Sequence, residues 1–172
     1  MGTLRRAEER DADALVHLRA FMHEAMGDDA SDPAWVEACR DALVRRLGEP
    51  DRFAAYVVEV EGVAVSGGVG WLEEHLPSPS QLDGRRGHIA SMSTHPSHRG
   101  AGHGTQVLNG LLGWFAEHGI GRIDLRATPD GRPLYLAAGF RVLAGDTMAW
   151  TAPRVRPGLG FRTGEGAAVS RP

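Results

Sequence analysis

The segment His88–Gly119, HIASMSTHPSHRGAGHGTQVLNGLLGWFAEHG, contains the most informative pattern in this chain of 172 residues. It begins with residues that favour a β-strand, and it then places Gly100, Gly102 and Gly104 at alternate positions. Apolar residues follow at helical spacing until Gly119 ends the run. Three glycines would weaken a regular helix or strand by about 0.5–1 kcal/mol each, so we expect a turn here whose function offsets that cost.

A strand, a glycine-rich turn, a helix and a second strand over 122–128 form a βαβ unit, in which the turn leads into the start of the helix. The first amides of a helix have no intrahelical partner and its dipole is positive there, so backbone N–H groups without nearby Cβ atoms can surround a phosphate. Two common nucleotide motifs do not fit. The motif GxxxxGK[ST] requires a lysine, which the chain lacks, and the three glycines are spaced GxGxG rather than GxGxxG.

The rest of the chain alternates between helical and strand patterns. We expect one helix from Asp11 to Gly27 and another that Asp32 caps and Gly48 ends, with Cys39 on its buried stripe. A short helix is expected over 129–139, before the end of the ordered domain. Seven strands are expected, over 4–7, 53–60, 63–72, 88–94, 122–128, 140–145 and 146–151.

Composition restricts the classes of partner. The net charge of −3 and the pI near 6.2 provide no general attraction for nucleic acid or anionic lipid, and no apolar run approaches the ~18 residues of a membrane span. One cysteine cannot form an intramolecular disulfide. We therefore expect a cytoplasmic protein that binds neither nucleic acid nor membrane, with one domain over residues 1–151 and a flexible tail over 152–172.

Two motifs together resemble the GCN5-related N-acetyltransferase (GNAT) superfamily. They are RxxGxG at Arg99–Gly104, with Pro96 shortly before it, and YxxxGF at Tyr135–Phe140. The resemblance covers about residues 3–151. It implies an α+β fold with a mixed, partly splayed sheet of about seven strands flanked by about four helices. It also implies transfer of an acetyl group from acetyl-CoA to a primary amine on a small molecule or peptide, by direct attack in a ternary complex.

The resemblance also implies where acetyl-CoA binds. Its pantetheine arm would lie along Met92, Ser93 and Thr94 like an added strand, with a backbone amide polarising the thioester carbonyl. Its pyrophosphate would bind the amides of Arg99, Gly100, Ala101, Gly102, His103, Gly104 and Thr105.

Acetyl transfer to an amine needs a group that accepts a proton and a group that protonates the departing thiolate. His88, Glu73 and Glu74 are candidates for the base, although residues at strand ends are often merely solvated. Tyr135 occupies the motif position that implies the acid, and the alternative is a core tyrosine whose hydroxyl bonds to the backbone. The polar segment 73–87 is a candidate wall of the site.

His95, His98 and His103 are spaced as metal ligands sometimes are, but no cysteine or carboxylate accompanies them, so no metal is expected. The acidic residues near the start of the second helix suit turns and caps, and with Glu73 and Glu74 they would favour a cationic acceptor. Two other functions remain open, namely a non-catalytic acyl-CoA sensor or partner-binding module and an unrelated nucleotide-binding domain. The identity of the acceptor and any exchange of the final strands in a homodimer are also open.

Overall fold

The computed structural model describes residues 2–143. Its core is a single five-stranded sheet in the order β1-β2-β3-β4-β5, antiparallel except for the last pair, which is parallel. The strands are β1 Thr3–Arg6, β2 Phe53–Val60, β3 Val63–Glu74, β4 Arg85–Thr94 and β5 Ile123–Leu125. The helices are α1 Ala12–Ala25, α2 Pro33–Leu47, α3 His103–Glu117 and α4 Arg132–Ala137, with short 3₁₀ turns at Glu9–Asp11 and Pro96–His98. This confirms the mixed α+β fold and the four predicted helices.

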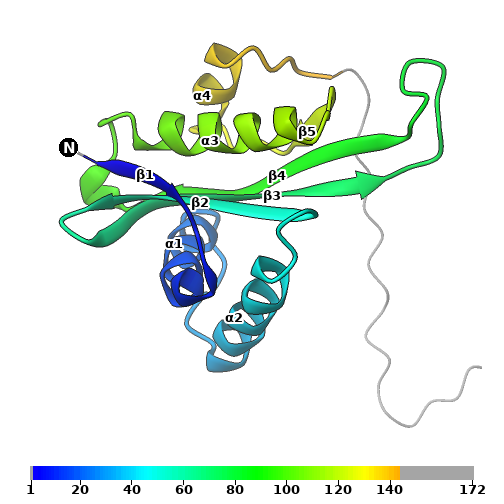
Figure 1. Ribbon diagram of the computed structural model, residues 1–172. Helices are drawn as coiled ribbons and strands as arrows, with labels where there is room; N and C mark the ends of the chain where they lie inside the picture. Colours follow the sequence, from blue (N-terminus) through cyan, green and yellow to red (C-terminus); the bar gives the residue numbers. More distant parts are fainter. Residues whose placement is uncertain (1, 144–172) are drawn as a thin grey trace, which may run out of the picture. The chain divides into compact units, whose positions relative to one another are not determined.

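The helices form a layer on each face of the sheet, α1 and α2 on one side and α3 and α4 on the other (Figure 1). Two apolar cores result. One lies under α3 and contains Leu111, Trp114 and Phe115, and the other lies against α1 and α2 and contains Leu15 and Phe53. Along β2, Ala54 and Val58 belong to the first core and Phe53, Ala55 and Val57 to the second, as expected for a strand covered on both faces.

Helix α3 packs closely on the sheet because glycines lie beneath it. A Cβ atom on Gly70 would stand 2.9 Å from the Phe115 ring, and one on Gly87 would stand 2.5 Å from it. Both distances are shorter than side chains permit, so these two positions need glycine for the helix to approach. The close approach fixes α3, and with it the glycine-rich turn at its N-terminus.

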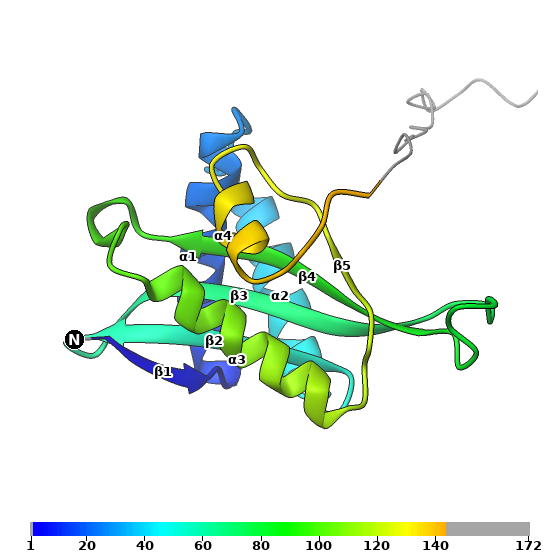
Figure 2. The same cartoon turned by 90° about the horizontal axis from the view of Figure 1, so that it is seen from above.

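A β-bulge interrupts strand β4. The register with β3 shifts between Gly67 and Val69, and Ser91 has a φ of 54°, a left-handed conformation that is uncommon for serine. The parallel pairing of β4 with β5 covers only residues 87–89 of β4. After β5 the chain leaves the edge of the sheet for α4 (Figure 2). Beyond Ile89, therefore, one edge of β4 has no neighbouring strand in the described part of the chain.

Several boundaries differ from the sequence prediction. β3 continues to Glu74 and β4 begins at Arg85, so the predicted loop 73–87 shortens to residues 75–84, which connect the two strands of a long hairpin. β5 is shorter than predicted. Of the two final predicted strands, residues 140–143 are irregular. Residues 144–151 and the predicted tail lie outside the described residues. Within residues 2–143, no helix combines the length and apolar character that crossing a membrane requires.

Candidate acetyl-CoA and acceptor site

The glycine-rich turn presents a set of free backbone donors. Gly100 and Gly102 both have a φ of 80°, which turns the chain sharply into α3. Within the described part of the chain, the amides of residues 100–105 donate no hydrogen bond to backbone or side chain. Because these amides include the first turn of a 15-residue helix, the helix dipole adds to their attraction for an anion.

Gly104 adds a separate indication of ligand binding. A Cβ atom there would lie 3.6 Å from Leu134 Cδ2 and 3.8 Å from Thr94 Oγ1, both ordinary contact distances, and its φ is not in the left-handed region. Neither packing nor backbone conformation therefore requires glycine at this position. A ligand that must approach the helix backbone closely does require it.

The side chains around this turn have different surroundings. Arg99 is exposed, and its Nε donates a 3.3 Å hydrogen bond to the carbonyl of Thr94. The His103 side chain is buried near Gly2 and its Nδ1 has no hydrogen-bond partner in the described residues. Of the predicted phosphate-binding residues, His103 can thus contribute its amide, whereas its imidazole belongs to the protein interior.

The free edge of β4 runs from Ile89, where pairing with β5 ends, to this turn. The His95 amide donates to Val65 on β3, and Ser93 accepts from Ser66 on β3, so both backbones face inward. Backbone groups alternate along a strand, so those of Met92 and Thr94 face the open edge. Among the three residues predicted to line the pantetheine arm, Met92 offers it backbone groups, Thr94 offers its amide because its carbonyl accepts from Arg99, and Ser93 offers none.

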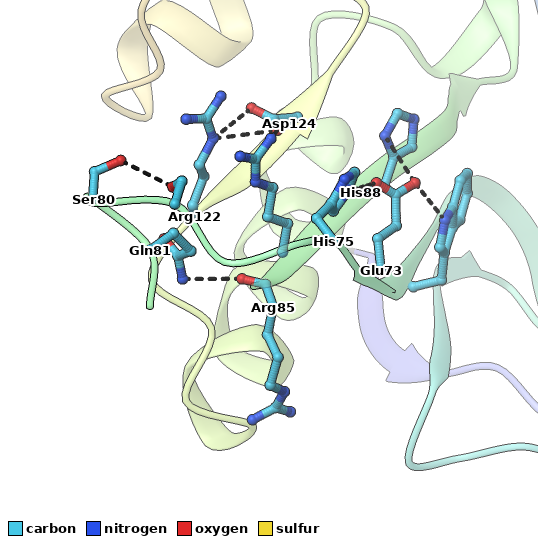
Figure 3. A network of polar contacts seen from close by, with 11 residues as sticks. Glu73, His75, Ser80, Gln81, Arg85, His88, Arg122 and Asp124 are labelled. Carbon is cyan, nitrogen blue, oxygen red and sulfur yellow. Dashed lines mark hydrogen bonds and ion pairs between the residues drawn. The ribbon is translucent and has the colours of Figure 1, made fainter. Parts of the chain in front are cut away.

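His88 and Glu73 lie close together (Figure 3). They share a face of the sheet with Trp71 and Ala90, which pack on the core against α1 and α2. The His88 ring stacks on Trp71 with centroids 4.5 Å apart, and its Nδ1 lies 3.8 Å from Glu73 Oε1. That separation exceeds a direct hydrogen bond but suits an electrostatic pair. With Nδ1 turned toward the carboxylate, Nε2 is the ring atom left to meet a substrate, and 27% of the side chain is exposed.

Glu73 is better suited to orient His88 than to accept a proton. Burial is the largest influence on its pKa and would raise it, but hydrogen bonds from His75 and Trp71 and the nearby imidazoles together hold the pKa below its ordinary value. Glu74 does not join this group. It alternates to the opposite side of the strand and pairs with Arg52 at 3.4 Å, with 75% of its side chain exposed.

Tyr135 is buried on α4, on the other face of the sheet, in edge-to-face contact with Phe140. Burial raises the pKa of its hydroxyl, so the group is protonated at neutral pH. That hydroxyl makes no hydrogen bond to any residue in the described range 2–143. The alternative of a core tyrosine bonded to the backbone therefore finds no partner there.

His88 and Tyr135 come from opposite faces of the sheet, and no direct contact joins them. His88 lies within the short stretch of β4 that pairs with β5, next to Ile89, where that pairing ends.

The remaining candidates have structural roles. Nδ1 of His95 and Nδ1 of His98 both bond to the Ser97 hydroxyl, at 2.8 and 2.9 Å, and no cluster of potential metal ligands is found among residues 2–143.

Asp29 accepts hydrogen bonds from Ser31. Asp32 caps α2, as its sequence position indicated. Burial raises the pKa of Cys39, which packs against the second core.

One feature of this face has no counterpart in the sequence prediction. A pocket of about 280 Å³ lies beside Trp71, at the end of α2, and its lining is Arg45, Arg46, Glu49, Arg52, Phe53, Trp71 and Leu72. Arginines in the last turn of a helix are common because they complement its dipole, so Arg45 and Arg46 carry no special signal in the sequence. Only the folded chain brings them to the residues around His88.

Comparison with known proteins supports the resemblance. The model of the acetyltransferase (GNAT) family matches residues 14–140. A GCN5-related N-acetyltransferase from Ralstonia eutropha is 30% identical, covers 87% of this chain and 99% of its own, and superposes with a TM-score of 0.77. A protein described as a predicted acetyltransferase from Clostridium acetobutylicum, crystallised with acetyl-CoA, is 25% identical, covers 89% and 96%, and has a TM-score of 0.74.

Glucosamine-6-phosphate N-acetyltransferase from Arabidopsis thaliana shares the fold at 16% identity, with a TM-score of 0.70 and coverage of 88% of this chain and 99% of its own. No curated protein matches the chain. The family model spans both sequence motifs and most of the described sheet. The chain therefore belongs to the GNAT family of acetyltransferases.

Proposed function

We propose that this protein transfers the acetyl group of acetyl-CoA to a primary amine on a small molecule or peptide, by direct attack in a ternary complex. The observation that carries the proposal is the path from the open edge of β4 to the first turn of α3, whose unpaired groups are the backbone of Met92, the amide of Thr94 and the amides of residues 100–105. It begins beside His88 and ends at the turn that suits a pyrophosphate. The residues present therefore fit acetyl-CoA, which supplies the acetyl thioester.

The backbone groups along this path bind different parts of acetyl-CoA. The amides of residues 100–105 hold the pyrophosphate, and Met92 and Thr94 pair with the pantetheine amides in the manner of an added strand. A backbone amide near the bulge at Ser91 donates to the thioester carbonyl, where negative charge develops. These contacts use backbone groups, so the chain needs few special side chains to bind acetyl-CoA.

The side chains handle the protons. His88 Nε2 accepts a proton from the incoming ammonium group, and Glu73 stabilises the imidazolium through Nδ1. The freed lone pair of the amine forms the new C–N bond, the nitrogen of the adduct then loses its second proton to solvent, and the C–S bond breaks. The Tyr135 hydroxyl, kept protonated by burial, donates a proton to the departing sulfur.

The test is release of free CoA from acetyl-CoA with a panel of amines that includes amino acids, polyamines, amino sugars and peptides with free N-termini. Acetyl-CoA binding is measured separately by calorimetry. We expect saturable, amine-dependent CoA release. Tight binding with no release for any amine would contradict catalysis and favour a non-catalytic acyl-CoA sensor, while preference for NAD or ATP over CoA would contradict the proposed site.

A further inference from the structure

The pocket beside Trp71 has a cationic rim. Three arginines and one glutamate line it, and neither Arg45 nor Arg46 has a carboxylate within 4.0 Å among the described residues. Arg52 already has a partner, because its Nη2 lies 3.4 Å from Glu74. Arg45 and Arg46 are therefore the two charges available to a ligand in this pocket.

Aromatic contacts hold Arg46 in place. Its guanidinium carbon lies 5.2 Å from the centre of the Trp71 ring and 5.7 Å from that of Phe53. Stacking of this kind restricts the side chain while leaving its N–H groups free, and the planar fork of an arginine suits two-point binding of carboxylate or phosphate oxygens. The pocket thus presents a partly preorganised anion receptor.

The pocket also adjoins the proposed base. Trp71 on β3 lines the pocket and also stacks on His88 of the neighbouring strand β4. The register pairs Trp71 with Phe53 on β2 and with His88 on β4, so the three residues lie in one row across the sheet. Neighbouring strands are about 4.8 Å apart, so the span from the pocket to His88 is about 5–10 Å. One small molecule can reach both.

We propose that the acceptor carries an anionic oxygen group, a carboxylate or phosphate, which Arg45 and Arg46 bind while His88 meets its amine. This inference rests on the proposed function, because it places the amine at His88. The proposed acceptor has an amine and an anionic group separated by a short chain. This differs from the cationic acceptor that the acidic residues suggested in the sequence. The acidic residues that remain near His88 would then attract the ammonium end alone.

The kinetic test uses amines of matched chain length: γ-aminobutyrate and γ-aminopropylphosphonate carry an anion, butylamine ends in a methyl group, and putrescine carries a second ammonium. We expect kcat/KM for the better anionic amine to exceed that for butylamine and putrescine at least tenfold, roughly the effect of one charge-assisted hydrogen bond. Arg46→Gln should remove most of this preference. Arg40→Gln, on the same helix but paired with Asp13 outside the pocket, should keep it.

A binding measurement separates this inference from the proposed function. In the presence of CoA, γ-aminobutyrate or γ-aminopropylphosphonate should shift the NMR signal of the Trp71 indole N–H, assigned with Trp71→Phe, and Arg46→Gln should weaken that shift at least tenfold in apparent affinity. Equal use of all four amines, or a shift unaffected by Arg46→Gln, would overturn the pocket assignment and leave the proposed function intact. Indole shifts with no CoA release would instead support the pocket and contradict catalysis.

Discussion

In the proposed reaction one imidazole takes the first proton from the acceptor ammonium group, and one hydroxyl group protonates the departing sulfur. The Tyr135 hydroxyl is buried, stays protonated and has no partner among the described residues, so it is free to donate. His88 is partly exposed, and Glu73 lies beside the nitrogen that faces away from the proposed acceptor. The two roles are separable by single substitutions because the two side chains lie on opposite faces of the sheet.

Tyr135→Phe removes the hydroxyl and keeps the ring. We expect kcat to fall at least about tenfold, within the range for loss of a general acid, with unchanged acetyl-CoA Kd and Tm because no hydrogen bond in the described structure is broken. Tyr56→Phe, at the other tyrosine of the chain, is the matched control and should leave kcat unchanged. A drop in Tm with kcat preserved in Tyr135→Phe would show that the hydroxyl is structural.

His88→Ala should reduce kcat/KM most near neutral pH, because the amine substrate is then an ammonium ion and the variant lacks the base that deprotonates it. Activity should recover toward the wild-type level at high pH, where the amine loses its proton to solvent. The measurement is a pH profile of both proteins, with Glu74→Gln as the control because that exposed carboxylate lies away from His88. A His88→Ala profile parallel to that of the wild type would exclude His88 as the base.

The turn before α3 shows how an entire element is adapted to a ligand. Gly100 and Gly102 are required by their left-handed backbone, whereas Gly104 is required by neither backbone nor packing. The helix then starts without a side-chain cap, which leaves its first amides free. A helix optimised for stability alone would have a capping residue and an alanine in these positions.

Gly104→Ala therefore separates stability from binding. Alanine is favoured over glycine in a helix by about 0.5–1 kcal/mol, so Tm should rise slightly, while the added methyl group should weaken acetyl-CoA binding at least about tenfold. Gly113→Ala, on the exposed side of the same helix with open space at its Cβ, should raise Tm without changing acetyl-CoA Kd. Calorimetry and thermal unfolding on the three proteins provide both measurements. Equal affinities would remove Gly104 from the binding surface.

Local patterns in the sequence predicted the helices and the hairpin at Glu61-Gly62 because caps, periodicity and turn residues act over a few positions. The motif at Arg99–Gly104 likewise predicted a turn with free amides. The bulge at Ser91 could not be predicted from the sequence, because it depends on the register of β4 against β3. The contact of Arg46 with Trp71 could not be predicted either, because only folding brings α2 and β3 together.

Across the whole molecule, one ion-pair network joins the first strand to the rest of the sheet and to α1. Arg5 on β1 donates to both carboxylate oxygens of Asp11 at 2.7 Å and to Glu59 on β2 at 2.7 Å. Asp11 is buried and also accepts from the Glu8 amide at 2.8 Å, directly before α1. Because the Asp11 carboxylate is buried and bound at both oxygens, its contribution to folding should exceed that of a carboxylate in a surface pair.

Asp11→Asn should therefore lower the free energy of unfolding by about 1.5–3 kcal/mol at neutral pH, the range for hydrogen bonds to charged groups. The hydrogen bonds from Arg5 hold the pKa of Asp11 below its ordinary value, so its stabilising effect is complete above that ordinary value and is lost as the pH falls through the lower, folded-state pKa. The stability difference between wild type and Asp11→Asn should accordingly shrink at acidic pH. Urea unfolding from neutral pH to pH about 3 measures it, with Asp13→Asn as the exposed control that should change little. A difference that stayed constant with pH would show that the ionised carboxylate is not what stabilises the fold.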